Sequence, residues 1–121
     1  MEKVKKQEVG SLFVSYEEAL ELKELGFNEP CIATYDEDKE FEIQDFEQNY
    51  DTFPSHIIAA PLYQQAFRWF REKYNIHIRI EKYNETKWWA NWGSWTSEIY
   101  DSYEETELAC LKKLIEIVKN K

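Results

Sequence analysis

The segment from Ala60 to Tyr74 is the most strongly specified helix of the sequence, and it lies at the midpoint of the chain. Pro61 suits the first helical position, because the N–H that proline lacks would have no intrahelical partner there. At 100° per residue, the apolar side chains fall within one arc of roughly 160°. These side chains are Leu62, Tyr63, Ala66, Phe67, Trp69, Phe70 and Tyr74. Such an arc is wider than a coiled-coil seam, so we expect the helix to pack on a sheet or in a core with its aromatic rings buried.

The tetrapeptide Ser-Tyr-Glu-Glu occurs twice, at residues 15–18 and 102–105, and each copy has the pattern of a capping box. In this box the serine oxygen accepts a hydrogen bond from a first-turn N–H, and the glutamate three residues later reaches back. The first box predicts a helix that Gly26 ends in the left-handed conformation. The second predicts a terminal helix with a wide apolar stripe. Because the apolar positions after the boxes differ, we interpret them as two separate caps and not as a repeat.

Five segments alternate between apolar and polar residues with the period of a β-strand, namely 31–35, 40–44, 75–81, 87–92 and 95–100. The first two flank the polar turn 36–39 and predict a hairpin, and residues 56–58 add a short strand before the central helix. Residues 45–53 look like an exposed loop. Only hairpin-length links join consecutive strands. The sequence therefore predicts an α+β fold, an antiparallel sheet of about four to six strands packed on one face by three helices.

The length of 121 residues predicts a single domain over residues 1–121, with residues 1–10 as a charged tail. A chain of this size can bury a core without disulfides or metals. Cys31 and Cys110 belong to no Cys-x-x-Cys motif and have no histidine nearby. We expect two buried thiols in a reducing compartment.

Acidic residues outnumber basic ones by 24 to 15, which gives a formal net charge of −9. Nucleic acids and anionic membranes repel a negative chain, so we expect neither as a partner, whereas a basic protein is compatible with this charge. The N-terminal residues lack the apolar core of a secretory signal, and no apolar run approaches the roughly 20 residues that span a bilayer. We therefore expect a cytoplasmic protein.

The sequence contains no legible catalytic motif. Its three glycines form no phosphate-binding loop, and neither His56 nor His77 lies in a His-Glu-x-x-His or His-x-Thr arrangement. Residues 36–47 place oxygen ligands at the spacing of a calcium loop, but Phe41 stands where that loop requires glycine. We expect no catalytic residue, no cofactor and no metal site.

The four tryptophans within residues 88–95 are too close along the chain for all of them to point inward. Strand alternation places Trp88 and Trp92 on one face and Trp89 on the other. At least one ring is then exposed, unless a loop or the N-terminal tail covers it. An exposed ring among polar neighbours is typical of a protein-binding hot spot or of a platform for a sugar. The candidate partner-binding surface consists of Trp88, Trp89, Trp92, Trp95, His77 and Arg79.

Three stretches carry a family resemblance: the A-P-x-x-x-Q-A-F-R-W-F-R-E-K-Y run at 60–74, residues 16–31 and residues 103–119. Together they cover somewhat under half of the chain, and they resemble a family of small uncharacterised proteins encoded by gut-dwelling bacteria and their phages. The segments 36–59 and 75–101 show no family pattern. The resemblance implies a shared scaffold with a variable surface, and it implies no activity.

These observations favour a small acidic cytoplasmic protein that binds another protein through a sheet face or the hairpin at 88–95. The phage resemblance suggests regulation or inhibition of a host protein as one use. One alternative is a small hydrolase that uses carboxylates with His77. Another is a binder of single-stranded nucleic acid, because basic and aromatic residues are interleaved in residues 68–89. The overall charge and three local glutamates weigh against this second alternative.

Overall fold

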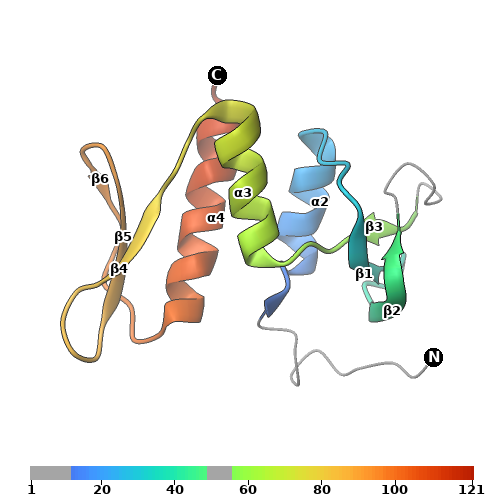
Figure 1. Ribbon diagram of the computed structural model, residues 1–121, viewed down its shortest axis with the longest axis horizontal. Coiled ribbons are helices and arrows are strands. Elements are labelled where there is room, and N and C mark those ends of the chain that lie inside the picture. The colour runs from blue at the N-terminus through green and yellow to red at the C-terminus, as the bar shows by residue number, and fades with distance from the viewer. Residues whose placement is uncertain (1–11, 49–55) are drawn as a thin grey trace. The chain divides into compact units, whose positions relative to one another are not determined.

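The computed structural model describes residues 12–48 and 56–121 (Figure 1). They form three helices and six strands, which confirms the predicted α+β class. The strands are shared between two three-stranded sheets, where the sequence predicted one sheet. The chain divides into two compact units, residues 1–65 and 66–121, and each unit is described by itself.

The first unit contains one helix and one antiparallel sheet. Its elements are α2 (Tyr16–Glu24), β1 (Cys31–Tyr35), β2 (Phe41–Gln48) and β3 (Ile58–Ala59). The strand order is β2-β1-β3, so the predicted hairpin and the predicted short strand both belong to this sheet. The sheet ends at β3 because the chain then enters a helix, and the strand that follows this helix pairs with another partner.

Three aromatic rings lie at the centre of this unit's core. The ring centroid of Phe41 lies 5.2 Å from that of Phe13 and 5.5 Å from that of Tyr35. The Tyr35 hydroxyl donates a 2.8 Å hydrogen bond to the Val14 carbonyl, which satisfies its polar atom inside the core. This packing fixes the segment before α2 against the hairpin.

The helix α2 ends as predicted but begins differently. Gly26 has a φ of 97°. Its N–H and that of the next residue donate to the carbonyls of Lys23 and Leu22 at 3.0 and 2.9 Å, which are the two bonds of a Schellman motif. The Ser15 side chain accepts no hydrogen bond from the N–H groups of α2. Its hydroxyl donates a hydrogen bond to the Glu18 carboxylate. The predicted serine cap is wrong at this position.

The strand β2 continues to Gln48, whereas the sequence predicted a loop from Asp45 onward. The end of β2 still pairs with β1, because Gln48 lies opposite Cys31. The pairing register between the two strands shifts between Cys31 and Ala33. A bulge of this kind lengthens a strand without continuing the alternation on which the prediction depended. The remainder of the predicted loop, 49–53, lies outside the described residues.

The helix α3 (Tyr63–Tyr74) begins two residues after Pro61, the predicted first helical residue. Pro61 is not its first residue, because the Pro61 carbonyl accepts the Val14 N–H at 2.9 Å and Leu62 forms a β-bridge with Phe13. This pairing holds the chain extended up to Leu62, which is exposed. The predicted burial is confirmed for Tyr63, Ala66, Phe67, Trp69 and Phe70.

The second unit combines most of α3 with a second sheet and a long helix. The sheet consists of β4 (Arg79–Lys82), β5 (Trp88–Trp92) and β6 (Trp95–Thr96), in the order β4-β5-β6, and the helix is α4 (Tyr103–Lys119). The strands are shorter than predicted, but the meander and its turn at Gly93 and Ser94 are as expected. Helix α4 lies against β4 and β5 (Figure 1).

The helix α4 has the predicted cap. Ser102 Oγ accepts the Glu105 N–H at 3.1 Å, and Thr106 Oγ1 donates to the Ser102 carbonyl at 2.9 Å. Its buried side chains are Thr106, Glu107, Cys110, Leu111, Leu114 and Ile115. None of the helices in the described parts of the chain is long and apolar enough to cross a membrane.

Candidate binding surface on the β4–β6 sheet

The two faces of the second sheet are distinguished by the contacts of β5. The ring centroids of Trp88 and Tyr103 lie 5.0 Å apart in an edge-to-face arrangement, so Trp88 points toward α4. Side chains two residues apart in a strand share a face, which places the buried Ala90 on the α4 side as well. Trp92 follows in the same alternation, and it pairs across the turn with Trp95. Three of the four tryptophans therefore belong to the α4 side.

The opposite face of the sheet carries Trp89. Its ring lies 5.1 Å from the Tyr83 ring in a T-shaped contact, and Tyr83 is 48% exposed. Beside this pair, Asn91 Nδ2 donates to Glu81 Oε1 at 2.7 Å, which shows that these two side chains also share the face. Arg79 lies opposite Asn91 in the register and is exposed. We call these five side chains, of Arg79, Glu81, Tyr83, Trp89 and Asn91, the outer face.

The structure thus separates the predicted site residues into two groups. Trp89 and Arg79 lie together on the outer face, whereas the exposed His77 lies two residues before Arg79, outside β4. Trp88, Trp92 and Trp95 lie on the α4 side. The sequence analysis did not include Tyr83 in the site. Tyr83 lies four residues after Arg79, and residues an even number apart in a strand share a face, so the alternation could have identified it.

Trp88 has a structural role in this arrangement. In addition to Tyr103, its ring contacts the Lys82 ammonium, which lies 4.8 Å from the ring centroid. The Trp88 N–H and carbonyl exchange hydrogen bonds of 2.9 and 2.8 Å with Tyr100. Because both its ring and its backbone are held within the unit, Trp88 is a weaker candidate for partner contact than Trp89.

The α4 side also contains an open groove between the β6 end of the sheet and α4. Its volume is about 340 Å³, and its walls include Trp95, Tyr100, Lys113 and Glu116. The Lys113 ammonium lies 5.4 Å from the Trp95 ring centroid and 3.0 Å from Glu116 Oε1. His77 is not among the groove's lining residues.

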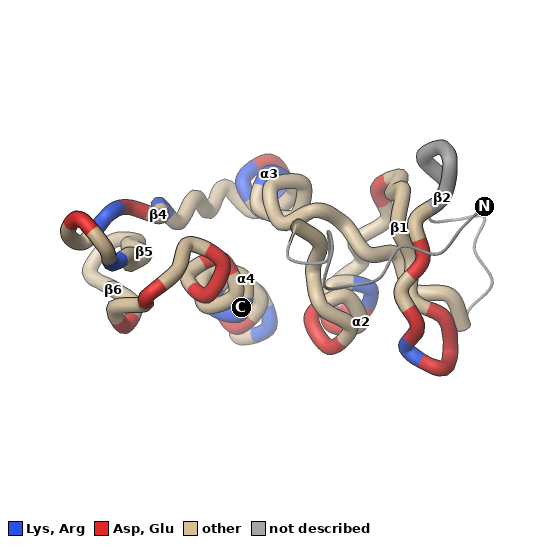
Figure 2. Tube along the Cα trace, turned by 90° about the horizontal axis from the view of Figure 1, so that it is seen from below, with Lys and Arg blue, Asp and Glu red and all other residues tan. Residues whose placement is uncertain are grey.

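The charge of the chain is divided unequally between the two units. Residues 1–65 contain 15 acidic and 5 basic residues, a formal charge of −10, whereas residues 66–121 contain 9 acidic and 10 basic residues, a charge of +1. In Figure 2, acidic residues lie along α2 and the turn between β1 and β2. In the second unit, acidic and basic residues are mixed. The acidic character is therefore a property of the first unit, and the outer face carries one Arg and one Glu.

The acidic turn of the first hairpin has a structural explanation. Asp36 Oδ1 accepts the N–H groups of Asp38 and Glu40 at 2.8 and 3.0 Å, which closes the turn as aspartate side chains often do. Within the described residues, no group of three or more His, Cys, Asp or Glu side chains could hold a metal ion. The Asp36 carboxylate thus serves the hairpin itself.

Both cysteines are buried thiols and neither is in a disulfide, as predicted. Burial, with a smaller contribution from the negative charge of Glu107, raises the pKa of Cys110 from 9.0 to about 12. A thiol with such a pKa stays protonated at neutral pH and is a poor nucleophile. Cys110 therefore belongs to the core of α4.

No protein-family model, no curated protein and no solved structure matches the chain. The resemblance of residues 60–74 to a gut-bacterial and phage family stays a prediction.

Proposed function

We propose that this chain is a small cytoplasmic protein-binding module and that the outer face of the β4–β6 sheet is its contact surface. One observation supports this proposal above the others. A tryptophan, a tyrosine and an arginine lie together on the face of the sheet opposite α4, with the Trp89 and Tyr83 rings 5.1 Å apart. These are the three residue types most enriched among the side chains that dominate the binding energy of protein interfaces.

The geometry of the face suits a flat protein contact. Trp89 and Tyr83 support each other edge-to-face, so both rings are held in place before a partner arrives and less side-chain entropy is lost on binding. Asn91 and Glu81 are joined by a hydrogen bond, which orients their remaining polar atoms beside the rings. The exposed Arg79 can form a two-pronged hydrogen bond with a partner carboxylate.

The charge of the whole chain adds a preference for the kind of partner. The formal charge of −9 repels nucleic acids and is compatible with a basic protein partner, while the unit that carries the outer face has a charge of +1. A regulatory role toward a host protein is suggested by the phage resemblance alone. The hydrolase hypothesis with His77 stays a prediction of the sequence.

The proposal is tested by affinity capture from host lysate with the double variant Tyr83→Ala, Trp89→Ala beside the wild type. The matched control is Trp92→Ala, which removes an equally large ring, 38% exposed, from the α4 side of the same strand. Thermal unfolding of each variant establishes that it folds. We expect a partner that the wild type and Trp92→Ala capture and the double variant loses. Equal capture by all three proteins would remove the outer face from the proposal.

A further inference from the structure

The second sheet has an edge at β4. This strand stands at the end of the order β4-β5-β6, as Figure 2 also shows. No strand among the described residues pairs with the side of β4 that faces away from β5, and we call this side the β4 edge. The N–H and C=O groups along such an edge can pair with another strand.

The hydrogen bonds of β5 show which β4 groups lie at this edge. The backbone groups of Trp88 and Ala90 bond to residues 97–100, on the side of β5 away from β4. The residues opposite them in β4 are Lys82 and Ile80. In an antiparallel ladder, hydrogen-bonded pairs alternate with pairs that are not bonded to each other. The N–H and C=O groups of Ile80 and Lys82 therefore point to the β4 edge.

Two opposite charges stand two residues apart along β4. Arg79 and Glu81 are both exposed and share the outer face. Arg79 forms no ion pair with another described residue, and Glu81 accepts a hydrogen bond from the neutral Asn91. Each of the two charges can therefore pair with an opposite charge that a further strand brings.

A second β4 strand brings these charges in one antiparallel arrangement. If Ile80 lies opposite Ile80 of a second copy, Arg79 of each copy lies directly opposite Glu81 of the other, and both contacts are favourable. Ile80 and its copy then form a hydrogen-bonded pair, which agrees with the direction of their backbone groups. Centring the pairing on residue 79 or 81 would set two arginines or two glutamates against each other, which is unfavourable. The charges therefore select one register.

The charged side chains of β4 distinguish it from an ordinary protected edge. Charges on an edge strand normally discourage pairing with other strands, but those of β4 match an identical strand. The net charge of this unit, +1 over residues 66–121, also allows two copies to approach there. The edge strand β2 differs in both respects, because it lies in the unit with a charge of −10 and all its charged residues are acidic.

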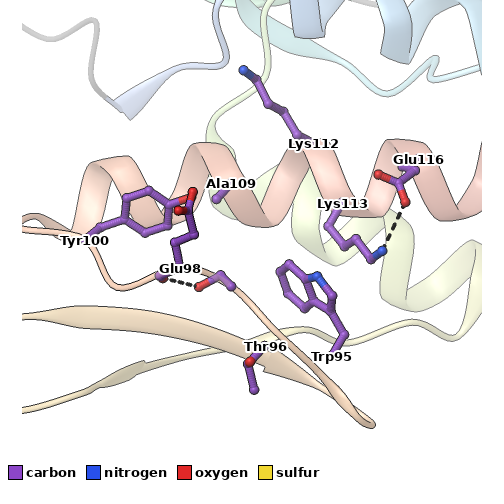
Figure 3. A pocket seen from close by; sticks show the side chains of 9 residues that line it. Trp95, Thr96, Glu98, Tyr100, Ala109, Lys112, Lys113 and Glu116 are labelled. Atoms are coloured by element: carbon purple, nitrogen blue, oxygen red, sulfur yellow. Dashed lines mark hydrogen bonds and ion pairs between the residues drawn. The ribbon is translucent and has the colours of Figure 1, made fainter.

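The other edge of the second sheet, at β6, is not equivalent to the β4 edge. β6 consists of two residues, Trp95 and Thr96. Figure 3 shows the Lys113 side chain of α4 beside the Trp95 ring, with the Lys113 ammonium 5.4 Å from the ring centroid and 3.0 Å from Glu116 Oε1. The β6 edge is therefore short and already in contact with α4, so β4 is the edge that a further strand can extend.

We propose that two copies of the chain pair through the β4 edge, antiparallel and centred on Ile80, with Arg79 of each copy against Glu81 of the other. The two three-stranded sheets then form one sheet of six strands. A second copy is the favoured occupant of the edge, because the charge pattern of β4 is complementary to itself. Trp89 lies on β5, away from this edge, so this proposal and the proposed function can fail separately.

The test is sedimentation of the 121-residue chain and of two charge-reversal variants, each alone and both mixed in equal amounts. The concentration runs from about 10 µM to 1 mM, because a small interface gives a weak dimer. We expect a wild-type dimer whose dissociation constant rises at least about tenfold in Arg79→Glu and in Glu81→Arg, since each variant sets like charges against each other twice. The mixture should recover most of the affinity, because every glutamate then faces an arginine. A wild type that stays monomeric, or a mixture that associates no better than the single variants, would overturn the proposal.

Two further variants control for the net charge. Arg71→Glu and Glu85→Arg change the charge of the chain as the two test variants do, but they lie at exposed positions outside β4. Each should leave the dissociation constant within about twofold of the wild type, because salt screens charges that are far from the contact. Losses as large as those of the test variants would mean that dimerisation does not depend on the charges of β4, and would contradict the site.

The backbone pairing is tested at Lys82, whose N–H points to the β4 edge. Lys82→Pro removes this N–H and keeps the bonds between β4 and β5, whereas Lys82→Ala removes only the side chain. Thermal unfolding establishes whether each variant folds. We expect the alanine variant to dimerise and the proline variant to stay monomeric. Equal association of the two folded variants would show that the copies do not meet as strands and would overturn the proposal. If Lys82→Pro does not fold, the mixture of charge variants decides the question alone.

Discussion

The ring of Trp88 meets the ring of Tyr103 edge-on, with centroids 5.0 Å apart, and this contact joins the first residue of β5 to the first residue of α4. The backbone of Trp88 is paired with Tyr100 at the same place, and Lys87 forms an ion pair with Asp101. The start of the strand is thereby fixed to the start of the helix. This connection determines that the Trp88 side of the sheet is covered and that the Trp89 side is left for other contacts.

Replacing Trp88 with alanine should destabilise the chain by about 2 kcal/mol, less than for a fully buried tryptophan because the ring is half-buried. The lost contacts are those with Tyr103 and with the Lys82 side chain. Urea unfolding followed by circular dichroism measures the change. Trp92→Ala serves as the control, since its ring is 38% exposed and should cost under about 1 kcal/mol. Equal losses for the two variants would contradict the anchoring role of Trp88.

The Ser102 cap should be worth about 1 kcal/mol of unfolding free energy, because its Oγ satisfies the Glu105 N–H at 3.1 Å. Ser102→Ala removes this acceptor, whereas Ser102→Asn supplies another oxygen at the same position. We expect the alanine variant to lose stability and the asparagine variant to retain most of it, as measured by urea unfolding. A loss of the same size in both would assign the effect to the bond of the Ser102 hydroxyl with Glu105 Oε1 or to crowding, and not to capping.

Patterns that are local in the sequence predicted the local structure well. The buried arc of α3 follows from a period of 3.6 residues, and the Schellman end of α2 follows from Gly26 at a position that needs positive φ. The strand alternation also placed Trp88 and Trp89 on opposite faces. The same Ser-Tyr-Glu-Glu motif, however, caps α4 and does not cap α2, although the serine hydroxyl donates to the glutamate three residues later in both copies.

Features that depend on residues far apart in the sequence escaped prediction. The bridge between Phe13 and Leu62 delays the start of α3, and the register shift between Ile43 and Gln48 extends β2. The division into two sheets also depends on distant residues, because it is determined by which strands pair with which. For the candidate site, alternation could separate the tryptophans, but only the contact of Trp88 with α4 shows which face is covered. The single domain over residues 1–121 stays a prediction.

Replacing Phe70 with alanine should cost about 3–5 kcal/mol, since its ring is fully buried and the cavity left behind adds to the lost burial. Its centroid lies 5.0 Å from that of Trp69 and 6.1 Å from that of Tyr74, so the loss reaches two further rings. Phe70→Leu keeps most of the volume and should cost under about 1.5 kcal/mol. Arg71→Ala, on the exposed face of the same helix, should leave the urea midpoint within error. A mild effect of Phe70→Ala would show that the ring is not a core residue.

The raised pKa of Cys110 makes the stability fall at alkaline pH. The unfolded thiol ionises near 9.0, whereas the folded thiol, held neutral by burial, ionises near about 12. Below pH 9 the thiol is protonated in both states and its stabilisation is complete. Above pH 9 the unfolded state releases the proton first, so the free energy of unfolding falls by up to about 1.4 kcal/mol per pH unit until the folded thiol also ionises.

This pH dependence is measured by urea unfolding of the wild type and Cys110→Ala between pH 8 and pH 10. Removing the thiol lowers the stability by the same amount at every pH below 9, and above it the wild type should lose about 1.4 kcal/mol more than the variant by pH 10. Leu111→Ala is the control, because it truncates a fully buried side chain of the same helix and leaves the thiol in place, so it should keep the wild-type slope. The comparison with Cys110→Ala isolates the thiol from Tyr35, whose pKa is also raised by burial and by the charges near it. Parallel curves for the wild type and Cys110→Ala would mean that the folded thiol ionises as readily as the unfolded one and is open to water.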